Sequence, residues 1–135
     1  MPAQLHCEQL LVTGGAGFIG AHLVEHLLAQ FPAARVKVID SLTYAGDLNR
    51  LNQAMRSGRV TFAHGDIADK GFVANAMRGM DMVFHLAAES HVSRSFLAPS
   101  LFDRTNRPGT AAVMQSALKA GVRLVIHVST DEVYA

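Results

Sequence analysis

The sequence of 135 residues contains no tryptophan and a single cysteine, Cys7. One cysteine cannot form an internal disulfide, and such sparing use of cysteine is typical of proteins in a reducing compartment. No uninterrupted apolar segment approaches the ~20 residues that a membrane-spanning helix requires. The residues before Leu10 also lack the basic region followed by an apolar run that marks a secretory signal peptide. We therefore expect a cytoplasmic protein without a membrane partner.

The sequence also lacks a clear excess of positive or negative charge. Twelve Lys and Arg residues stand against eleven Asp and Glu residues, which leaves a formal charge of +1. A surface that binds nucleic acid or an anionic membrane usually needs a clear basic excess, so neither partner is predicted. Two of the seven histidines, His22 and His26, stand four positions apart, which suits metal binding. No third ligand accompanies them, and no metal site is expected.

Half of the residues are hydrophobic and 17% are charged, which is the composition of one globular domain with a substantial core. Short apolar segments alternate with amphipathic ones, as in a parallel sheet with helices on both faces. The pattern predicts strands at Leu10–Thr13, Val36–Asp40, Val60–Ala63, Met82–Leu86 and Leu124–Val128, and helices at Phe18–Gln30, Leu48–Arg56, Lys70–Arg78 and about Pro99–Ala120. We predict an α/β fold, a Rossmann-like doubly wound sheet of order 3-2-1-4-5, that fills residues 1–135 as one domain.

The last of these helices contains Pro108 followed by Gly109. Proline inside a helix removes a hydrogen-bond donor and clashes with the preceding turn, at a cost of ~3 kcal/mol or more. Either the helix begins here, with Pro108 in its first turn, or it is kinked, and we favour a kink. In the first helix the periodic apolar residues, among them Phe18, Leu23 and Leu27, are expected to face the core.

Glycines recur at every third position after the first predicted strand, as Gly14, Gly17 and Gly20. The first permits a sharp strand-to-helix turn, the second lets the backbone approach a pyrophosphate, and the third lets the helix pack closely on the sheet. The diphosphate would lie at the helix N-terminus, where N–H groups and the helix dipole favour anions. Because the motif stands between a strand and a helix, it predicts a dinucleotide-binding site.

Asp40 supplies the second part of this site. It ends the second predicted strand, about twenty residues after the glycine motif, where a carboxylate can accept hydrogen bonds from both hydroxyls of the adenosine ribose. The carboxylate would repel a 2′-phosphate, and the next residue is Ser41 rather than an arginine, so NAD is favoured over NADP. Asp66 and Ile67, just past the third strand, are placed to flank the adenine. The alternative is that Asp40 is an ordinary surface residue at a strand end.

Two adjacent carboxylates follow the fifth predicted strand, in the segment Ser129–Glu132. Doubly wound sheets bind ligands at the carboxyl ends of their strands. Two carboxylates beside the hydroxyl of Thr130 could divide acid and base roles if their surroundings separate their pKa values. Asp131 and Glu132 are therefore candidate catalytic residues. From composition alone, a polar loop after a strand is the more common explanation of the same residues, because Asp and Glu are frequent in loops.

Four segments together resemble the extended short-chain dehydrogenase/reductases, namely Leu11–Gly20, Leu42–Gly46, Phe84–Val92 and Ser129–Tyr134. Within that superfamily they most resemble the dTDP-glucose 4,6-dehydratases, because Thr-Asp-Glu combined with Ala-Glu-Ser-His-Val is a narrow pattern. Sugar epimerases of the superfamily usually lack the acidic pair, and GDP-mannose dehydratases usually show a different triplet. The resemblance covers nearly the whole chain and implies a lyase of nucleotide-sugar metabolism that uses NAD.

The resemblance also implies a reaction and the roles of individual residues. The C4 hydroxyl of dTDP-glucose is oxidised by hydride transfer to NAD⁺, water leaves across C5–C6, and the hydride returns to C6 to give dTDP-4-keto-6-deoxyglucose. Thr130 would hold the C4 oxygen, Asp131 would protonate the departing hydroxyl and Glu132 would take the C5 proton. Ser90 would contact the dTDP-sugar. The residues that would line NAD, besides the glycines Gly14, Gly17 and Gly20, are Phe18, Ile19, Asp40, Leu42, Thr43, Asp66, Ile67, Leu86, Ala87, Ala88 and Thr105.

Departures from the family pattern qualify this expectation. The pattern continues with a Tyr-x-x-x-Lys pair, whose tyrosinate abstracts the hydroxyl proton, and with a small substrate-binding domain. The present sequence ends at Ala135 before either of them, and Ser41, Ser93 and Arg107–Pro108 replace the usual residues. We expect the 135-residue chain to supply the cofactor site and the acid–base pair, to expose one apolar face of its sheet, and to turn over weakly or not at all.

Other functions compete with this one. The main alternative is a non-catalytic NAD-binding half-protein or remnant that needs a second chain. A homodimer or such a completing chain would be its protein partner. A related epimerase or decarboxylase is a weaker alternative, because Asp131 and Glu132 are not the residues expected of those enzymes.

Overall fold

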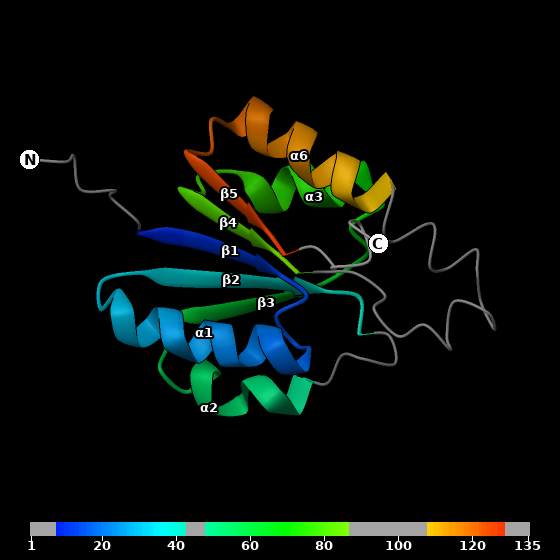
Figure 1. Cartoon of the computed structure of the whole chain (residues 1–135). Coiled ribbons are helices and arrows are strands. Elements are labelled where there is room, and N and C mark those ends of the chain that lie inside the picture. Colours follow the sequence, from blue (N-terminus) through cyan, green and yellow to red (C-terminus); the bar gives the residue numbers. More distant parts are fainter. Residues whose placement is uncertain (1–7, 43–47, 87–107, 129–135) are drawn as a thin grey trace, which may run out of the picture.

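A parallel sheet with helices on both faces is formed by residues 8–42, 48–86 and 108–128, the parts of the chain that the computed structural model describes (Figure 1). The strands are β1 (Gln9–Thr13), β2 (Arg35–Asp40), β3 (Val60–His64), β4 (Met82–His85) and β5 (Leu124–His127). The helices are α1 (Phe18–Gln30), α2 (Asn52–Met55), α3 (Lys70–Met77) and α6 (Pro108–Ala120), with a 3-10 turn, η1 (Leu48–Leu51), before α2.

The strands run parallel in the order β3-β2-β1-β4-β5, which confirms the predicted topology. At the carboxyl end of the central strand, Thr13 pairs with Ile39 of β2 on one side and with His85 of β4 on the other. His85 pairs in turn with His127 of β5. In a parallel sheet the carboxyl ends of all strands lie at one edge, where doubly wound folds bind their ligands.

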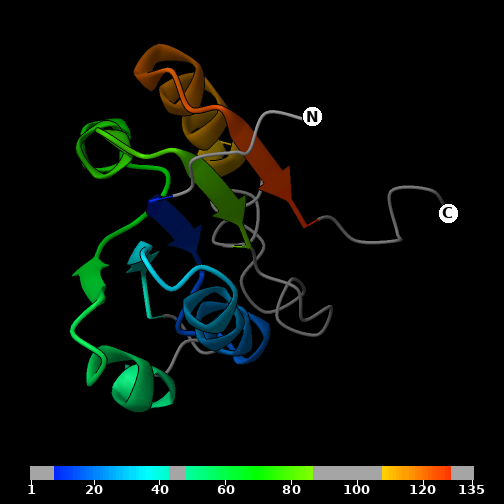
Figure 2. The same ribbon diagram turned by 90° about the vertical axis from the view of Figure 1, so that its left-hand side faces the viewer.

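The helices form two layers, with α1 and α2 against one face of the sheet and α3 and α6 against the other (Figure 1, and Figure 2 from the side). Successive residues of a strand point to opposite faces. The buried side chains therefore form two clusters, one on each face. The cluster beside α1 includes Leu10, Val12, Val24, Leu27, Val36, Val38 and Phe84. The cluster beside α3 and α6 includes Leu11, Ile39, Val73, Met77, Val83, Val113 and Ala117.

The edge strand β5 is less covered than the others. Val125 packs against the cluster beside α3 and α6, whereas Leu124 and Ile126 each expose 38% of their surface and Val128 exposes 50%. By strand alternation, Leu124 and Ile126 point to the α1 side of the sheet. The expected exposed apolar face is confirmed for these residues. A tendency to associate through that face remains a prediction.

Some predicted boundaries and environments differ from the structure. The helix expected over residues 48–56 is a 3-10 turn followed by one short helical turn, which ends before Gly58. The last helix is described from Pro108 onward, so residues 99–107 and any kink there lie outside the described residues. Phe18 was expected in the core and is 67% exposed, because it lies on the outer face of α1 beside the exposed His22, whereas the buried residues of the helix are Gly20, Ala21, Val24 and Leu27. None of the described helices is long and apolar enough to cross a membrane.

The C-terminal end of α1 is held by a single side chain from the start of β3. The Nη1 of Arg59 donates to the carbonyl oxygens of Phe31 at 3.0 Å, Pro32 at 3.0 Å and Ala34 at 3.1 Å. Its Nη2 donates to the carbonyl of Leu28 at 2.8 Å. The last carbonyls of a helix lack intrahelical partners and carry the negative end of its dipole, so a guanidinium satisfies both needs.

We predict that Arg59→Ala lowers the free energy of unfolding by about 2 kcal/mol, because hydrogen bonds from a charged donor are lost and half-buried carbonyls stay unpaired. Urea denaturation followed by circular dichroism measures the change. Arg59→Lys should recover only part of it, since an ammonium lacks the planar fork of donors. Arg56→Ala, at an exposed arginine nearby, is the control and should stay within about 0.5 kcal/mol of the native chain. Equal urea midpoints for Arg59→Ala and Arg56→Ala would contradict the prediction.

Candidate functional site

A tight turn joins β1 to α1 at the centre of the sheet edge. Gly14 has a φ of 74°, which favours glycine, and its N–H donates to the carbonyl of Ile39 at 2.8 Å. The Gly17 N–H then donates back to the carbonyl of Gly14 at 3.1 Å. Gly17 is the N-cap of α1, and no side-chain hydrogen bond caps the helix there. The first N–H groups of a helix lack intrahelical partners, so this helix end can receive an anion.

The other glycines of the motif are required by close backbone approach. A Cβ atom on Gly20 would lie 2.2 Å from the carbonyl oxygen of Gly14 and 2.8 Å from the Cα of Gly15. The third glycine of the motif was predicted to let the helix pack closely on the sheet, and its close contact is with Gly14 and Gly15, the two residues that directly follow β1. Gly15, which the sequence reasoning left without a role, fits the turn to the sheet. A Cβ atom there would lie 2.5 Å from Cγ1 of Val38.

Asp40 lies at the end of β2, next to this turn, and is buried. Its Oδ2 accepts a hydrogen bond from the Ala16 N–H at 3.0 Å, and its Oδ1 accepts one from the Leu42 N–H at 2.8 Å. The carboxylate therefore holds the glycine turn and the segment after β2 together. Two carboxylate oxygens offer about four acceptor sites, so hydroxyl groups of a ribose can still bind. The alternative reading of Asp40 as an ordinary surface residue is wrong.

The apolar residues predicted to line the cofactor differ in their exposure. Phe18 and Ile19, in the first turn of α1, expose 67% and 66% of their surface. Leu42, with a φ of 54°, and Leu86 are half-buried. Ile67 is buried in the cluster beside α3 and α6, so its side chain belongs to the core.

Asp66 is half-buried and forms a turn of its own. Its Oδ1 accepts from the Ala68 N–H at 2.9 Å. Such a side-chain turn is a common local motif. It positions the segment between β3 and α3 but does not by itself point to a ligand.

The remaining predicted site residues lie outside the described residues. They are Thr43, Ala87, Ala88, Ser90 and Thr105 of the nucleotide site and Thr130, Asp131 and Glu132 of the catalytic group. Leu86 and Val128 are the described residues directly before two of these segments, residues 87–107 and 129–135, and both are held by hydrogen bonds to a neighbouring strand. The Leu86 N–H donates to the carbonyl of Thr13 at 3.1 Å, and the Val128 N–H donates to the carbonyl of His85 at 3.1 Å.

Arg50 is a neighbour of the glycine turn that sequence reasoning missed. Its Nη1 donates to the carbonyl oxygen of Ala16 at 3.3 Å, so η1 brings a cation beside the residue that Asp40 holds. The preference for NAD was argued from the carboxylate of Asp40 and from Ser41, the residue directly after it. The signal that could have found Arg50 is a basic residue in the connection that leaves β2 at the ligand-binding edge.

A buried histidine also escaped the sequence reasoning. His85, at the end of β4, contacts the hydroxyl of Thr13 through Nδ1 at 2.6 Å and that of Thr110 of α6 through Nε2 at 3.0 Å. Its ring lies 5.0 Å from the ring of His127. Burial, with a smaller contribution from the charge of His127, lowers the pKa of His85 from 6.5 to about 4. His85 is therefore neutral at physiological pH, with one donor and one acceptor nitrogen.

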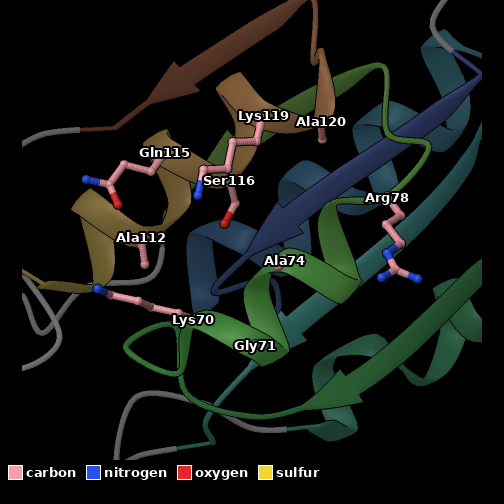
Figure 3. A pocket seen from close by; sticks show the side chains of 9 residues that line it. All are labelled: Lys70, Gly71, Ala74, Arg78, Ala112, Gln115, Ser116, Lys119 and Ala120. Atoms are coloured by element: carbon pink, nitrogen blue, oxygen red, sulfur yellow. The ribbon is translucent and has the colours of Figure 1, made fainter.

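A groove on the outer side of the helix layer is separate from this edge. It runs between α3 and α6 and is lined by Lys70, Gly71, Ala74, Arg78, Ala112, Gln115, Ser116, Lys119 and Ala120 (Figure 3). None of the predicted site residues lies in it. The exposed cations on its rim do not form a binding site by themselves. Among the described residues, no group of three or more His, Cys, Asp and Glu side chains could hold a metal ion.

Comparison with known proteins places the chain in a family. The sequence model of the GDP-mannose 4,6 dehydratase family matches residues 11–135. The chain belongs to this family. Members among its curated relatives include dTDP-glucose 4,6-dehydratases of Streptomyces antibioticus, 48% identical over 130 residues, and of Salmonella typhimurium, 42% identical over 137 residues. Each match covers 93% of this chain and 38% of the relative. The predicted resemblance to the dTDP-glucose 4,6-dehydratases is thereby confirmed.

Solved structures of similar proteins agree with the fold. The dTDP-glucose 4,6-dehydratase DesIV of Streptomyces venezuelae, crystallised with NAD bound, is 53% identical with a TM-score of 0.87. A UDP-glucose 4-epimerase of Thermotoga maritima is 33% identical with a TM-score of 0.79. The matches cover 93% and 90% of this chain, and 40% and 38% of those chains. The chain thus spans about two fifths of the length of these relatives.

We predict that Gly20→Ala destabilises the protein by about 3 kcal/mol, because the added methyl group meets backbone atoms that cannot move without opening the turn. The control is Gly71→Ala in α3, where a Cβ atom would lie 3.6 Å from Oδ1 of Asp69, an ordinary contact. That variant should be neutral or more stable by up to about 1 kcal/mol, since alanine favours helix. Urea unfolding decides between them, and a Gly20→Ala protein as stable as Gly71→Ala would refute the close-approach argument.

We also predict that the free energy of unfolding falls as the pH drops from about 6.5 toward 4, by roughly 3 kcal/mol at most from His85 alone. The lowered pKa means that the unfolded chain binds a proton in this window while the folded chain does not, so acid favours unfolding. Urea titrations at several pH values measure the slope. It should become shallower in His85→Gln and stay unchanged in His26→Gln, which alters an exposed histidine. Equal slopes in native and His85→Gln proteins would contradict the prediction.

Proposed function

We propose that the chain is the NAD-binding part of a nucleotide-sugar 4,6-dehydratase of the dTDP-glucose type. The observation that carries the proposal is the pairing of the glycine turn with the carboxylate of Asp40 at the N-terminus of α1. This geometry matches what a dinucleotide requires at its diphosphate and at its ribose. The identity to dTDP-glucose 4,6-dehydratases over 93% of the chain supports the substrate class.

The described residues fit NAD in three respects. Helix α1 begins directly after the turn that contains Gly14 and Gly17, and no side-chain hydrogen bond caps its first N–H groups, so they can receive a diphosphate. Asp40 is held in place by two backbone N–H donors and can accept from ribose hydroxyls. Phe18 and Ile19 offer exposed apolar surface beside the helix end. When bound, NAD would supply the oxidant for C4 of the sugar and the hydride for C6.

The chemistry between these two hydride transfers would fall to the segment after β5. We assign the C4 oxygen to Thr130, removal of the C5 proton to Glu132, and protonation of the leaving C6 hydroxyl to Asp131. Elimination next to a ketone needs one base and one acid, and the electrons of the broken C5–H bond form the C5–C6 double bond as water departs. Ser90 would contact the sugar nucleotide. The location of β5 beside β4 at the ligand-binding edge supports this assignment.

A second candidate function is a non-catalytic NAD-binding component that another chain completes. The exposure of Leu124, Ile126 and Val128 on the edge strand β5 favours it, because apolar side chains on a sheet edge are usually covered. In that case the chain would bind NAD, and turnover would depend on a partner that covers β5 and brings a tyrosine–lysine pair. A homodimer could cover β5 in the same way, but a second copy of these 135 residues would not bring that pair.

We predict that Asp40→Ala weakens NAD⁺ binding at least tenfold, because it removes the charged acceptor for the ribose and frees the glycine turn. Isothermal titration calorimetry of the 135-residue chain measures the dissociation constant. The matched control is Asp69→Ala, which also removes a carboxylate that accepts from a backbone N–H, that of Phe72 at 3.2 Å, but at the start of α3. Its affinity for NAD⁺ should equal that of the native chain.

Incubation of the NAD-loaded chain with dTDP-glucose distinguishes the two functions. Release of a 4-keto product, lost in Glu132→Gln, would support the dehydratase. NAD binding without any product would favour the component that needs a partner. A native chain that is folded by circular dichroism and binds no NAD⁺ would overturn both.

A further inference from the structure

We propose that His85 is a positioning residue for dinucleotide binding, which ties the turn after β1, the segment after β4 and the start of α6 into one arrangement. The inference rests on the proposed function, because it concerns how the NAD site is held. The imidazole of His85 is hydrogen-bonded to Thr13 and Thr110, neither of which is proposed to contact the cofactor. It acts through Thr13 and through the backbone that follows it.

The first link runs from the imidazole to the glycine turn. Nδ1 of His85 lies 2.6 Å from the hydroxyl oxygen of Thr13, the residue directly before Gly14. The same hydroxyl oxygen accepts a hydrogen bond from the Leu86 N–H at 3.0 Å, and the Thr13 carbonyl accepts from that N–H at 3.1 Å. One threonine therefore fixes both the end of β1 and the first residue after β4.

The second link runs to the opposite side of the ring. Nε2 of His85 lies 3.0 Å from the hydroxyl oxygen of Thr110, near the start of α6. In this way a single side chain joins two neighbouring strands and the helix above them at the ligand-binding edge. On the neighbouring strand β5, the ring of His127 lies 5.0 Å from the ring of His85.

Chemistry explains why an imidazole suits this position. A neutral imidazole carries one donor and one acceptor, so it can satisfy a hydroxyl at each end, which a phenyl ring cannot. The burial that keeps it neutral also makes it costly compared with an apolar side chain of the same size. The depressed pKa of His85 shows that burial disfavours the charged form, so the neutral ring is the one that makes these two contacts. A residue chosen for core stability alone would be apolar, as its neighbours Val83 and Phe84 are.

The experiment measures NAD⁺ affinity by calorimetry in His85→Phe, His85→Gln and Thr110→Val. The phenyl ring fills the space and removes both links, and we expect about a tenfold weaker dissociation constant, the effect of losing roughly one buried hydrogen bond. Thr110→Val removes only the link to α6 with little change of shape and should weaken binding about threefold. His85→Gln keeps a donor and an acceptor and should restore affinity to within about threefold of native. Thr61→Val, at an exposed threonine of β3, is the control and should bind as native does.

Amide hydrogen exchange on the same proteins reports the arrangement without NAD. The Leu86 and Gly14 amides should exchange at least tenfold faster in His85→Phe than in the native chain, with His85→Gln between the two. Native affinity in His85→Phe, or no rescue by glutamine, overturns the inference. If the native chain binds no NAD⁺, the proposed function fails instead, and unchanged exchange at these two amides in His85→Phe overturns the positioning role.

Discussion

The contact between Gly20 and the carbonyl of Gly14 is the constraint on which the site depends. It places the first turn of α1 directly against the end of β1, so the N-terminus of the helix opens at the sheet edge rather than above its face. Asp40 then fixes the same turn from β2 through the N–H of Ala16. Backbone proximity, rather than a reactive side chain, thus creates the space in which a diphosphate can bind.

Hydrogen bonds at the carboxyl edge of the sheet fix the relative positions of elements that are otherwise held together by the packing of the two apolar clusters. The carboxylate of Asp40 joins β2 to the glycine turn, and His85 joins β1 and β4 to α6. Hydrophobic packing is not directional, whereas these hydrogen bonds specify an angle and a distance. The core therefore determines the stability of the packed layers. The hydrogen bonds of Asp40 and His85 determine the position and direction in which the chain leaves the strands at the carboxyl edge.

Sequence reasoning predicted the strand order, α1 and the location of Asp40 at the end of β2, because each follows from a pattern with a fixed spacing. It misplaced Phe18 because it assigned every apolar residue of the helix to the core, whereas Phe18 shares the exposed face of α1 with His22. It gave no role to Arg50 or His85. The partner of Arg50, Ala16, lies 34 residues away in the sequence, and the partners of His85, Thr13 and Thr110, lie 72 and 25 residues away. Contacts of that kind depend on the tertiary structure and cannot be recognised from the spacing of residues in the sequence.

The all-parallel sheet has a consequence for how the chain acquires its structure. The central strand β1 forms its ladder with β4 across about 70 residues, as the bond between Thr13 and His85 illustrates. Ordering so long an intervening segment before this pairing is gained makes this type of topology fold slowly. During synthesis β1 can pair with β2 early, but its other edge has to wait for β4 to leave the ribosome and stays open to intermolecular pairing in the meantime.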